Sequence, residues 1–164
     1  LYGIASVGLR FFSVYGPRQR PDMAYNILIR ALLDEKTFPM FGDGEQTRDF
    51  TFVSDVADAC VTASERDDVA GRIFNVGSGS TYSVNLLCDL LGGEKVYIPK
   101  RPGEPDQTFA DTKRIQEVLG WQPKVKFEDG VKTMLANIDY WREAPIWEPT
   151  SIAEATKDWF KYLG

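Results

Sequence analysis

The chain has 164 residues, 43% of them apolar and 26% charged, which is the composition of an ordinary globular domain large enough to bury its own core. A net charge of −5 without clustered Lys or Arg argues against nucleic acid as a partner, and no apolar run reaches the roughly 20 residues of a membrane span. The absence of histidine excludes Ser-His-Asp and Cys-His nucleophile systems within the chain, and any zinc site built on imidazole.

The first half of the chain alternates between predicted strands and helices. Residues 7–14 are expected to form a buried strand that ends at a Tyr-Gly-Pro sequence, and Asp22 can cap the helix that follows. Residues 37–41 predict a short strand closed by a Gly-Asp-Gly turn. An alternating strand over 47–53 then leads into a helix that runs to about Glu65 and begins with a capping arrangement of aspartates.

The second half of the chain continues this alternation, with an irregular stretch over 99–109. It is predicted to contain, in order, a strand over 72–76, a helix over 83–91, a strand over 94–98, a helix over 112–119 and a longer amphipathic helix over 127–141. Gly120 is a candidate C-cap. Further on, Ser151 and Glu154 form a capping box for a final helix, whose apolar stripe we expect to dock on its own domain.

This alternation predicts an α/β protein with parallel strands. Residues 1–144 are expected to form one body and residues 145–164 a C-terminal helical extension. Strands 7–14 and 73–76 should be parallel neighbours that expose an unpaired edge and apolar faces. We expect a homodimer or larger assembly through that surface.

The two cysteines, Cys60 and Cys88, match no metal or redox spacing. Each lies at helical spacing among apolar neighbours, so both are predicted to be buried free thiols in a reducing compartment. Residues 1–9 show neither a basic n-region nor a small-residue cleavage site, so they are not expected to be a signal peptide. Cytoplasmic localisation is the expectation that follows.

Two glycine pairs invite comparison with dinucleotide-binding loops. Gly77 and Gly79 follow a strand and precede a helix, but the third glycine of a G-x-G-x-x-G motif would fall at Tyr82. Gly42 and Gly44 match the motif less well still. Both pairs are therefore predicted to be turns.

Seven short motifs follow one another along the chain. They are Leu-Arg-Phe-Phe-Ser-Val-Tyr-Gly-Pro-Arg at 9–18, Phe-Gly-Asp-Gly-Glu-Gln-Thr-Arg-Asp-Phe at 41–50, Val-Ser-Asp at 53–55, Phe-Asn-Val-Gly at 74–77, Arg-Pro-Gly-Glu at 101–104, Ala-Asp at 110–111 and Leu-Gly-Trp-Gln-Pro at 119–123. The ordered set resembles the C-terminal half of NAD-dependent nucleotide-sugar epimerases and dehydratases of the extended short-chain dehydrogenase/reductase type. The resemblance implies the last parallel strands of a Rossmann sheet and a small mixed α/β substrate-binding lobe.

The family pattern includes two features that this sequence does not contain. One is a Rossmann unit with a glycine-rich phosphate loop, and the other is a Tyr-x-x-x-Lys catalytic pair, since no tyrosine here has lysine four residues on. We therefore expect no catalytic residue in this chain, and no NAD bound by it alone. In the intact enzyme, which would use NAD, the resemblance implies that Phe11 and Phe12 contact the cofactor.

The resemblance also implies how a nucleoside diphosphate sugar is held. Arg48 and Arg101 match family arginines that bind the diphosphate, a task that suits the planar fork of guanidinium. Glu104 matches a family aspartate that binds the ribose hydroxyls, but its side chain is one methylene longer. Phe41 occupies the place of a residue that lies against the uracil. Taken alone, each arginine would be read as a surface ion pair and the phenylalanine as core.

Two further residues bear on the choice of sugar. Ser13, where many relatives carry asparagine, and Arg20 in the run Arg-Gln-Arg-Pro-Asp-Met at 18–23 resemble the UDP-glucuronate 4-epimerases. In that group the hydroxyl and the second arginine face the C6 carboxylate, and a buried carboxylate needs such a partner. The alternative is that Ser13 merely ends a strand and that Arg20 is solvated.

The implied reaction of the intact enzyme is epimerisation at C4 of a UDP-sugar, either UDP-glucuronate or UDP-glucose. Two alternatives remain open. One is a dehydratase or decarboxylase that uses the same lobe. The other is a non-catalytic module that binds UDP-sugar or pairs with a partner subunit.

Overall fold

The computed structural model describes residues 4–19, 23–100 and 102–143, and four isolated positions beyond them, 150, 154, 157 and 158. Its regular elements are β1 (Gly8–Phe11), β2 (Ser13–Tyr15), α1 (Ala24–Leu33), β3 (Phe38–Phe41), β4 (Thr47–Arg48), β5 (Phe50–Phe52), α2 (Val53–Ser64), β6 (Ile73–Val76), β7 (Tyr82–Ser83), α3 (Val84–Leu91), β8 (Lys95–Ile98), α4 (Lys113–Leu119) and α5 (Phe127–Ala136). Short 3-10 turns lie at Asp67–Val69 and Ile138–Trp141. None of the helices among the described residues is long and apolar enough to cross a bilayer.

The strands form four pairs, three of them parallel. β1 pairs with β6, β2 with β5 and β3 with β8 in parallel, and β4 pairs with β7 in antiparallel orientation. The β1–β6 register runs from Gly8 opposite Ile73 to Phe11 opposite Val76. The α/β fold with parallel strands and the expected pairing of strands 7–14 and 73–76 are confirmed.

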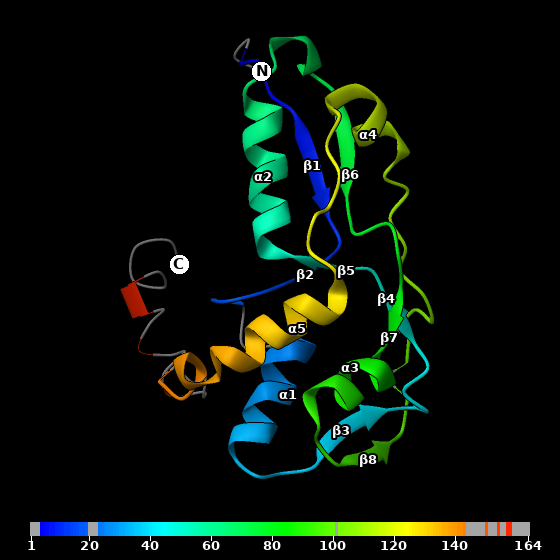
Figure 1. Ribbon diagram of the computed structural model, residues 1–164, viewed down its shortest axis with the longest axis vertical. Helices are drawn as coiled ribbons and strands as arrows, with labels where there is room; N and C mark the ends of the chain where they lie inside the picture. Colours follow the sequence, from blue (N-terminus) through cyan, green and yellow to red (C-terminus); the bar gives the residue numbers. More distant parts are fainter. Residues whose placement is uncertain are drawn as a thin grey trace.

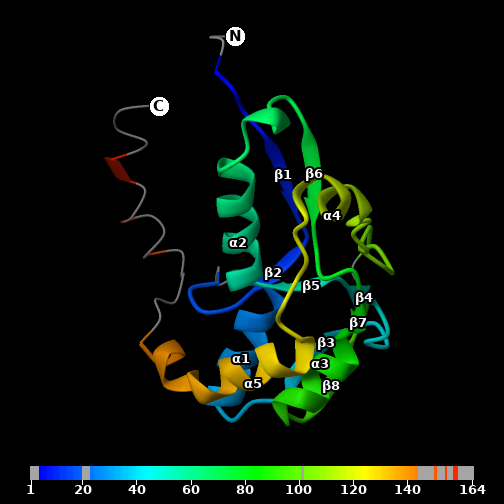
Figure 2. The same ribbon diagram turned by 45° about the horizontal axis from the view of Figure 1, so that its top comes forward.

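The elements gather in two regions (Figure 1). In the upper region, α2 and α4 lie beside the β1–β6 pair, and in the lower region α1 and α3 lie near the β3–β8 pair while α5 packs against α3 and β5. Figure 2 shows the same division from another side, with α5 lying across the lower region near α1 and α3. The β4–β7 pair stands between the two regions.

The prediction of one buried strand over residues 7–14 is wrong in two respects. The strand breaks at Phe12, whose N–H donates to the Val76 carbonyl at 3.2 Å, and the chain then leaves β6 to pair with β5. β1 is also largely exposed, and its last residue, Phe11, is 49% exposed to solvent. The reason is that only β6 pairs with β1 among the described elements. The strand therefore carries more apolar residues than its neighbours can cover.

The core of the lower region is built on aromatic rings. Tyr15 stacks on Tyr25 with ring centroids 4.7 Å apart, and Phe127 stacks on Phe50 at 5.2 Å and on Tyr82 at 4.2 Å. The Tyr15 hydroxyl donates to the Phe127 carbonyl at 3.2 Å, which joins β2 to the start of α5. Such pairs stabilise a core beyond the area that they bury.

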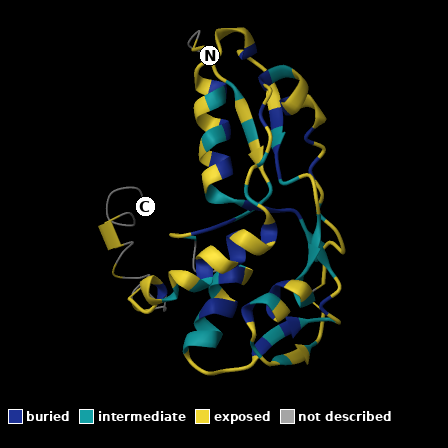
Figure 3. Cartoon of the chain, viewed as in Figure 1, coloured by how far each residue is buried: buried dark blue, intermediate teal, exposed yellow. Residues whose placement is uncertain are grey.

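A second core holds the upper region together. Its buried residues come from α2, the segment after it, β6, α4 and the segment after α4: Val56, Ala59, Ala63, Val69, Phe74, Val76, Ile115, Leu119 and Trp121. Figure 3 shows the outcome, with exposed positions along the outer side of α2 and on β1. The apolar residues of β6 are therefore covered on the helix side.

The helix ends confirm some predicted caps and correct others. The Ser83 hydroxyl accepts the Leu86 N–H at 3.1 Å at the start of α3, and Gly120 ends α4 with φ of 66° as the predicted C-cap. The expected aspartate cap of α2 is wrong. Phe52 is the N-cap without a side-chain bond, and the Asp55 carboxylate instead accepts two backbone N–H groups at residues 124 and 125.

Two more expectations need correction. Cys60 is exposed on α2, whereas Cys88 is buried as predicted, because the apolar face of α2 turns Val56, Ala59 and Ala63 inward instead. The helix predicted over 127–141 ends at Ala136 and continues as a separate 3-10 turn. The predicted cap at Asp22 and the final helix with its capping box lie outside the described residues, apart from isolated positions.

Candidate functional site

Two segments of the chain face each other beyond the carboxyl ends of β3 and β8. The Gly42 N–H donates to the Ile98 carbonyl at 2.8 Å where these two strands end. Farther along, the Thr47 N–H donates to the Asp106 carbonyl at 2.8 Å, and the Thr108 N–H returns a bond to Thr47 at 3.1 Å. These bonds fix residues 41–48 against the loop that follows β8, at the edge where α/β proteins bind ligands.

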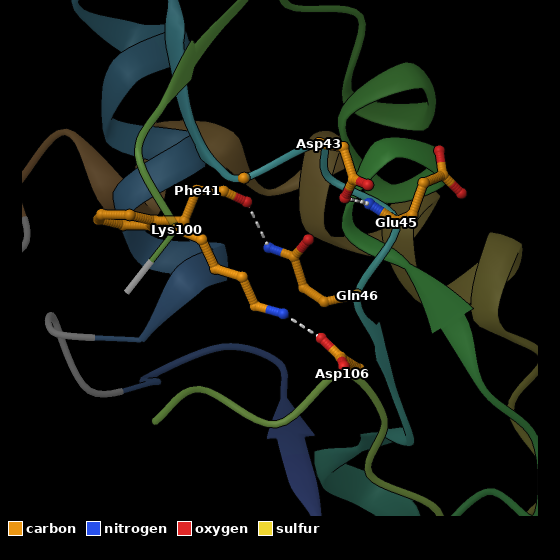
Figure 4. Close-up of a pocket in the computed structure, with 7 residues that line it drawn as sticks. Phe41, Asp43, Glu45, Gln46, Lys100 and Asp106 are labelled. Atoms are coloured by element: carbon orange, nitrogen blue, oxygen red, sulfur yellow. Dashed lines mark hydrogen bonds and ion pairs between the residues drawn. The ribbon is translucent and has the colours of Figure 1, made fainter. Parts of the chain in front are cut away.

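A cavity of about 420 Å³ lies between these segments (Figure 4). Its lining residues are Phe41, Gly42, Asp43, Glu45, Gln46, Lys100 and Asp106. The Gln46 side chain donates to the Phe41 carbonyl at 3.0 Å, and Lys100 pairs with Asp106 across the opening. This volume is in the range of small-molecule sites.

The charges of this cavity favour a neutral ring over a phosphate. Three carboxylates line it against one ammonium, so an anion would meet net repulsion. The hydrogen bond from Lys100 lowers the pKa of Asp106, and the same bond raises the pKa of Lys100, so this pair stays charged near neutral pH. The aromatic face of Phe41 is the feature that can bind a base.

Arg48 lies on β4 next to this cavity, and its guanidinium is held at two points. Nη1 donates to the Thr47 carbonyl and Nη2 to Glu104 Oε1, both at 2.8 Å. The two side chains are 14% and 25% exposed, whereas those of the Arg66–Asp68 pair are 40% and 60% exposed. The structure therefore brings two of the predicted site residues, 56 positions apart in the chain, into one partly buried ion pair.

A second cavity of about 420 Å³ lies at the carboxyl ends of β1 and β2. Its walls are mostly apolar, with one cation at Arg18, and consist of Phe11, Phe12, Val14, Tyr15, Gly16, Pro17, Arg18, Gln19, Met23 and Val53. The buried Gln19 Oε1 has no hydrogen-bond partner among the residues that the structure describes. The sequence-predicted cofactor contacts Phe11 and Phe12 thus lie together.

This second cavity fits only one end of NAD. A mostly apolar wall suits an uncharged ring, but a dinucleotide also needs backbone N–H groups around its phosphates. Gly77 and Gly79 do not supply them, because the segment connects β6 to β7 instead of opening a helix. Gly42 and Gly44 form the turn between β3 and β4, which confirms the prediction for that pair, whereas Gly77 lies in irregular backbone and Gly79 in a bend.

The remaining predicted site residues are placed differently. Ser13 begins β2 opposite Phe50 of β5, and its N–H donates at 3.0 Å to the carbonyl of Asp49, the residue that follows Arg48. Arg20 and Arg101 lie outside the described residues. Their roles stay predictions from the sequence.

Two functional candidates were not predicted from the sequence. Lys100 lines the cavity beside the predicted Arg101, and its position directly before the Arg-Pro-Gly-Glu motif is the signal that could have found it. Asp49 is completely buried next to Arg48. The alternating pattern of residues 47–53 did not predict this burial. It placed Asp49 and Thr51 on the face opposite Arg48, and both residues are buried.

The comparisons with known proteins agree with this geometry. The NAD dependent epimerase/dehydratase family matches residues 1–77. UDP-glucuronate 4-epimerase of Thermodesulfobacterium geofontis is 33% identical over 139 residues, which are 80% of this chain and 42% of that protein. The crystal structure of UDP-glucuronic acid 4-epimerase from Bacillus cereus, in complex with UDP-glucuronic acid and NAD, matches with a TM-score of 0.75 and 38% identity over 82% of this chain and 44% of that one.

A third relative is UDP-glucose 4-epimerase of Thermotoga maritima, solved with UDP-glucose. It matches with a TM-score of 0.77 and 36% identity over 87% of this chain and 47% of that one. The chain thus spans less than half the length of these relatives. It belongs to the NAD-dependent epimerase/dehydratase family and corresponds to the C-terminal part of its Rossmann-type members.

Proposed function

We propose that this chain is the substrate-binding portion of an NAD-dependent UDP-sugar 4-epimerase of the cytoplasm, and that it acts as a homodimer together with an NAD-binding half. The observation that carries the proposal is the guanidinium of Arg48, held partly buried beside a cavity that suits a neutral base. A nucleoside diphosphate carries a neutral base and an anionic diphosphate joined through a ribose, so its two ends match these two features. The crystal structures of relatives with UDP-sugars support the same assignment.

In this proposal the diphosphate takes the place of Glu104 on Arg48. Both ligands are anions that accept from the guanidinium fork, so the exchange keeps the arginine paired while the substrate enters. Glu104, once released, is free to accept from the ribose hydroxyls. Its longer side chain relative to aspartate gives it the reach for both partners.

The base would lie against Phe41 and the sugar would point toward Ser13. Ser13 and Arg48 are joined through the backbone of residue 49, so the two contacts have a fixed separation. NAD, where bound, would supply the acceptor and donor of the C4 hydride. The residues of this chain position the nucleotide and exclude water from it.

UDP-glucuronate is the substrate that we favour over UDP-glucose. The reason is the serine at position 13 and the arginine at position 20, whose hydrogen bonds suit the uronate carboxylate. Relatives of both specificities match the chain. The chain alone is proposed to be inactive and to leave NAD unbound, because the phosphate loop and the Tyr-x-x-x-Lys pair are not in its sequence.

Isothermal titration of the chain with UDP tests the proposal. UDP should bind, and Arg48→Ala should weaken it by about 10–100-fold, because hydrogen bonds to charged groups contribute about 1.5–3 kcal/mol. Arg66→Ala is the matched control, since it removes an arginine from an exposed ion pair just beyond the end of α2. NAD titrated under the same conditions should give no heat. Equal affinity of Arg48→Ala and wild type for UDP would contradict the proposal.

A further inference from the structure

Asp49 is a buried carboxylate that is satisfied entirely by neutral donors. Oδ1 accepts from the Ser78 N–H at 2.6 Å, the Ser78 hydroxyl at 2.8 Å and the Thr51 hydroxyl at 3.2 Å, and Oδ2 accepts from the Ala110 N–H at 3.1 Å. Three of these bonds reach Oδ1 and one reaches Oδ2, so both carboxylate oxygens have hydrogen-bond donors. Its side chain is 0% exposed, so the donors replace water completely.

The donors come from three separate parts of the chain. Thr51 belongs to β5, Ser78 follows β6, and Ala110 ends the loop that follows β8. The fit is close, because a Cβ added at Gly77 would lie 2.8 Å from Asp49 Oδ2 and 2.3 Å from Ala110 Cβ. Glycine at position 77 therefore makes room for the carboxylate, and the site is fixed on every side.

The position of Asp49 in the chain links this anchor to the substrate residues. It lies between β4 and β5, directly after Arg48. Successive side chains of an extended segment point to opposite sides, so fixing the carboxylate inward turns the arginine to the other side. The Asp49 carbonyl also accepts the Ser13 N–H at 3.0 Å, which fixes the start of β2 to the same residue.

We propose that Asp49 is a positioning residue that sets the Arg48 guanidinium for the nucleoside diphosphate. This inference rests on the proposed function and adds a residue that makes no contact with substrate. In the proposed exchange the guanidinium of Arg48 leaves Glu104 for the diphosphate, so its backbone is the part that the fold holds in place both before and after the ligand arrives. The Asp49 anchor fixes that backbone at the adjacent peptide.

Asp55 supplies the comparison that separates positioning from stability. It too is a buried carboxylate, 3% exposed, and accepts the N–H groups of Lys124 and Val125 at 3.1 and 3.0 Å. Its neighbours in the chain, Ser54 and Val56, contact neither cavity. Loss of either carboxylate should lower stability, but only Asp49 lies next to Arg48, the residue proposed to bind the diphosphate.

The test compares Asp49→Asn with Asp55→Asn by titration with UDP and by thermal unfolding. Asparagine replaces one carboxylate oxygen by an NH₂ group that cannot accept, so one N–H at Ser78 or Ala110 loses its acceptor. Asp49→Asn should weaken UDP binding by about tenfold, because a displaced Arg48 guanidinium loses one of its charge-assisted hydrogen bonds to the diphosphate. Asp55→Asn should leave UDP binding within about twofold while lowering the melting temperature.

A double variant shows whether Asp49 acts through Arg48. If it does, adding Asp49→Asn to Arg48→Ala should cause little further loss of UDP affinity, because the residue that it positions is gone. Additive losses, or unchanged UDP binding by Asp49→Asn, would overturn the inference and leave the proposed function standing. Absence of UDP binding by the wild type would overturn both.

If Asp49→Asn does not fold, Ser78→Ala provides a second test of the inference. It removes one hydroxyl donor and retains the carboxylate, the Ser78 N–H and the Ala110 N–H. It should weaken UDP binding by about threefold, again without further loss in the Arg48→Ala background. Ser64→Ala, which removes a hydroxyl bonded within α2, is its matched control and should bind UDP as the wild type does.

Discussion

The β1–β6 and β3–β8 pairs are alike in size and direction but differ in their surroundings. Each joins two parallel strands of four residues in a continuous register. Phe38 and Met40 of β3 are completely buried under helices, and exposed apolar residues of that pair, Val96 and Tyr97, lie on β8 alone, whereas both strands of the other pair carry one, Phe11 at 49% and Ile73 at 44%. Parallel strands are normally covered on both faces.

The difference teaches which part of the chain can stand alone. The β3–β8 region has its own core, and the cavity and Arg48 lie at its border. We therefore expect substrate binding to depend on a region whose core is formed by the described residues. The β1–β6 pair presents apolar side chains for which the described residues provide no cover. It is therefore the surface where we expect more protein to bind.

The largest effect should come from a core aromatic residue of the lower region. Phe127→Ala removes a ring that is 2% exposed and stacked on two others, and should lower the free energy of unfolding by about 3–5 kcal/mol. Phe11→Ala, at the exposed strand, should lower it by about 1 kcal/mol or less. Urea unfolding followed by circular dichroism measures both. Similar losses in the two variants would break the contrast between the regions.

The two cysteines report the same contrast through their reactivity. Burial raises the pKa of Cys88 to about 12, so its thiol stays protonated at pH 8 and is shielded in the lower core. Cys60 is exposed on α2. With a chromogenic disulfide reagent at pH 8, one thiol per chain should react at once and the other at least about 100-fold more slowly. Cys60→Ser should abolish the fast phase, and two fast thiols in the wild type would show that the lower core is open.

Self-association should depend on the exposed face of the upper region. We expect Phe11→Asp to shift the chain toward monomer in light scattering at high protein concentration, because a charge there cannot be buried against a second chain. Val61→Asp is the control, since Val61 is also exposed, at 56%, but lies on α2. A wild type that is monomeric throughout, or equal responses of the two variants, would argue against association through β1.

What the sequence predicts well is local. The strand at β3, the helix at α3 and the glycine end of α4 each depend on a few adjacent residues, and all three are confirmed. The pairing of the β1 and β6 segments was also predicted correctly, because the family resemblance implies it. The confirmed predictions are those whose determining contacts are close in the chain or shared with the family.

The unpredicted features are long-range. Asp49 is buried because donors arrive from residues 29 and 61 positions away, and no local pattern carries that information. Asp55 resembles a helix cap in sequence, but its partners are 69 and 70 positions away. Arg48 and Glu104 were each predicted to bind substrate, and their pairing with each other depends on how the loop after β8 folds back on β4.

The most direct measurement is a crystal structure of the chain with UDP bound. The account predicts the diphosphate on the Arg48 guanidinium, the Glu104 carboxylate displaced from Nη2, and the base against Phe41 in the cavity between residues 41–48 and the loop after β8. The Asp49 carboxylate should keep all four of its hydrogen bonds. UDP bound elsewhere, with the 2.8 Å pair between Arg48 and Glu104 intact, would contradict the account.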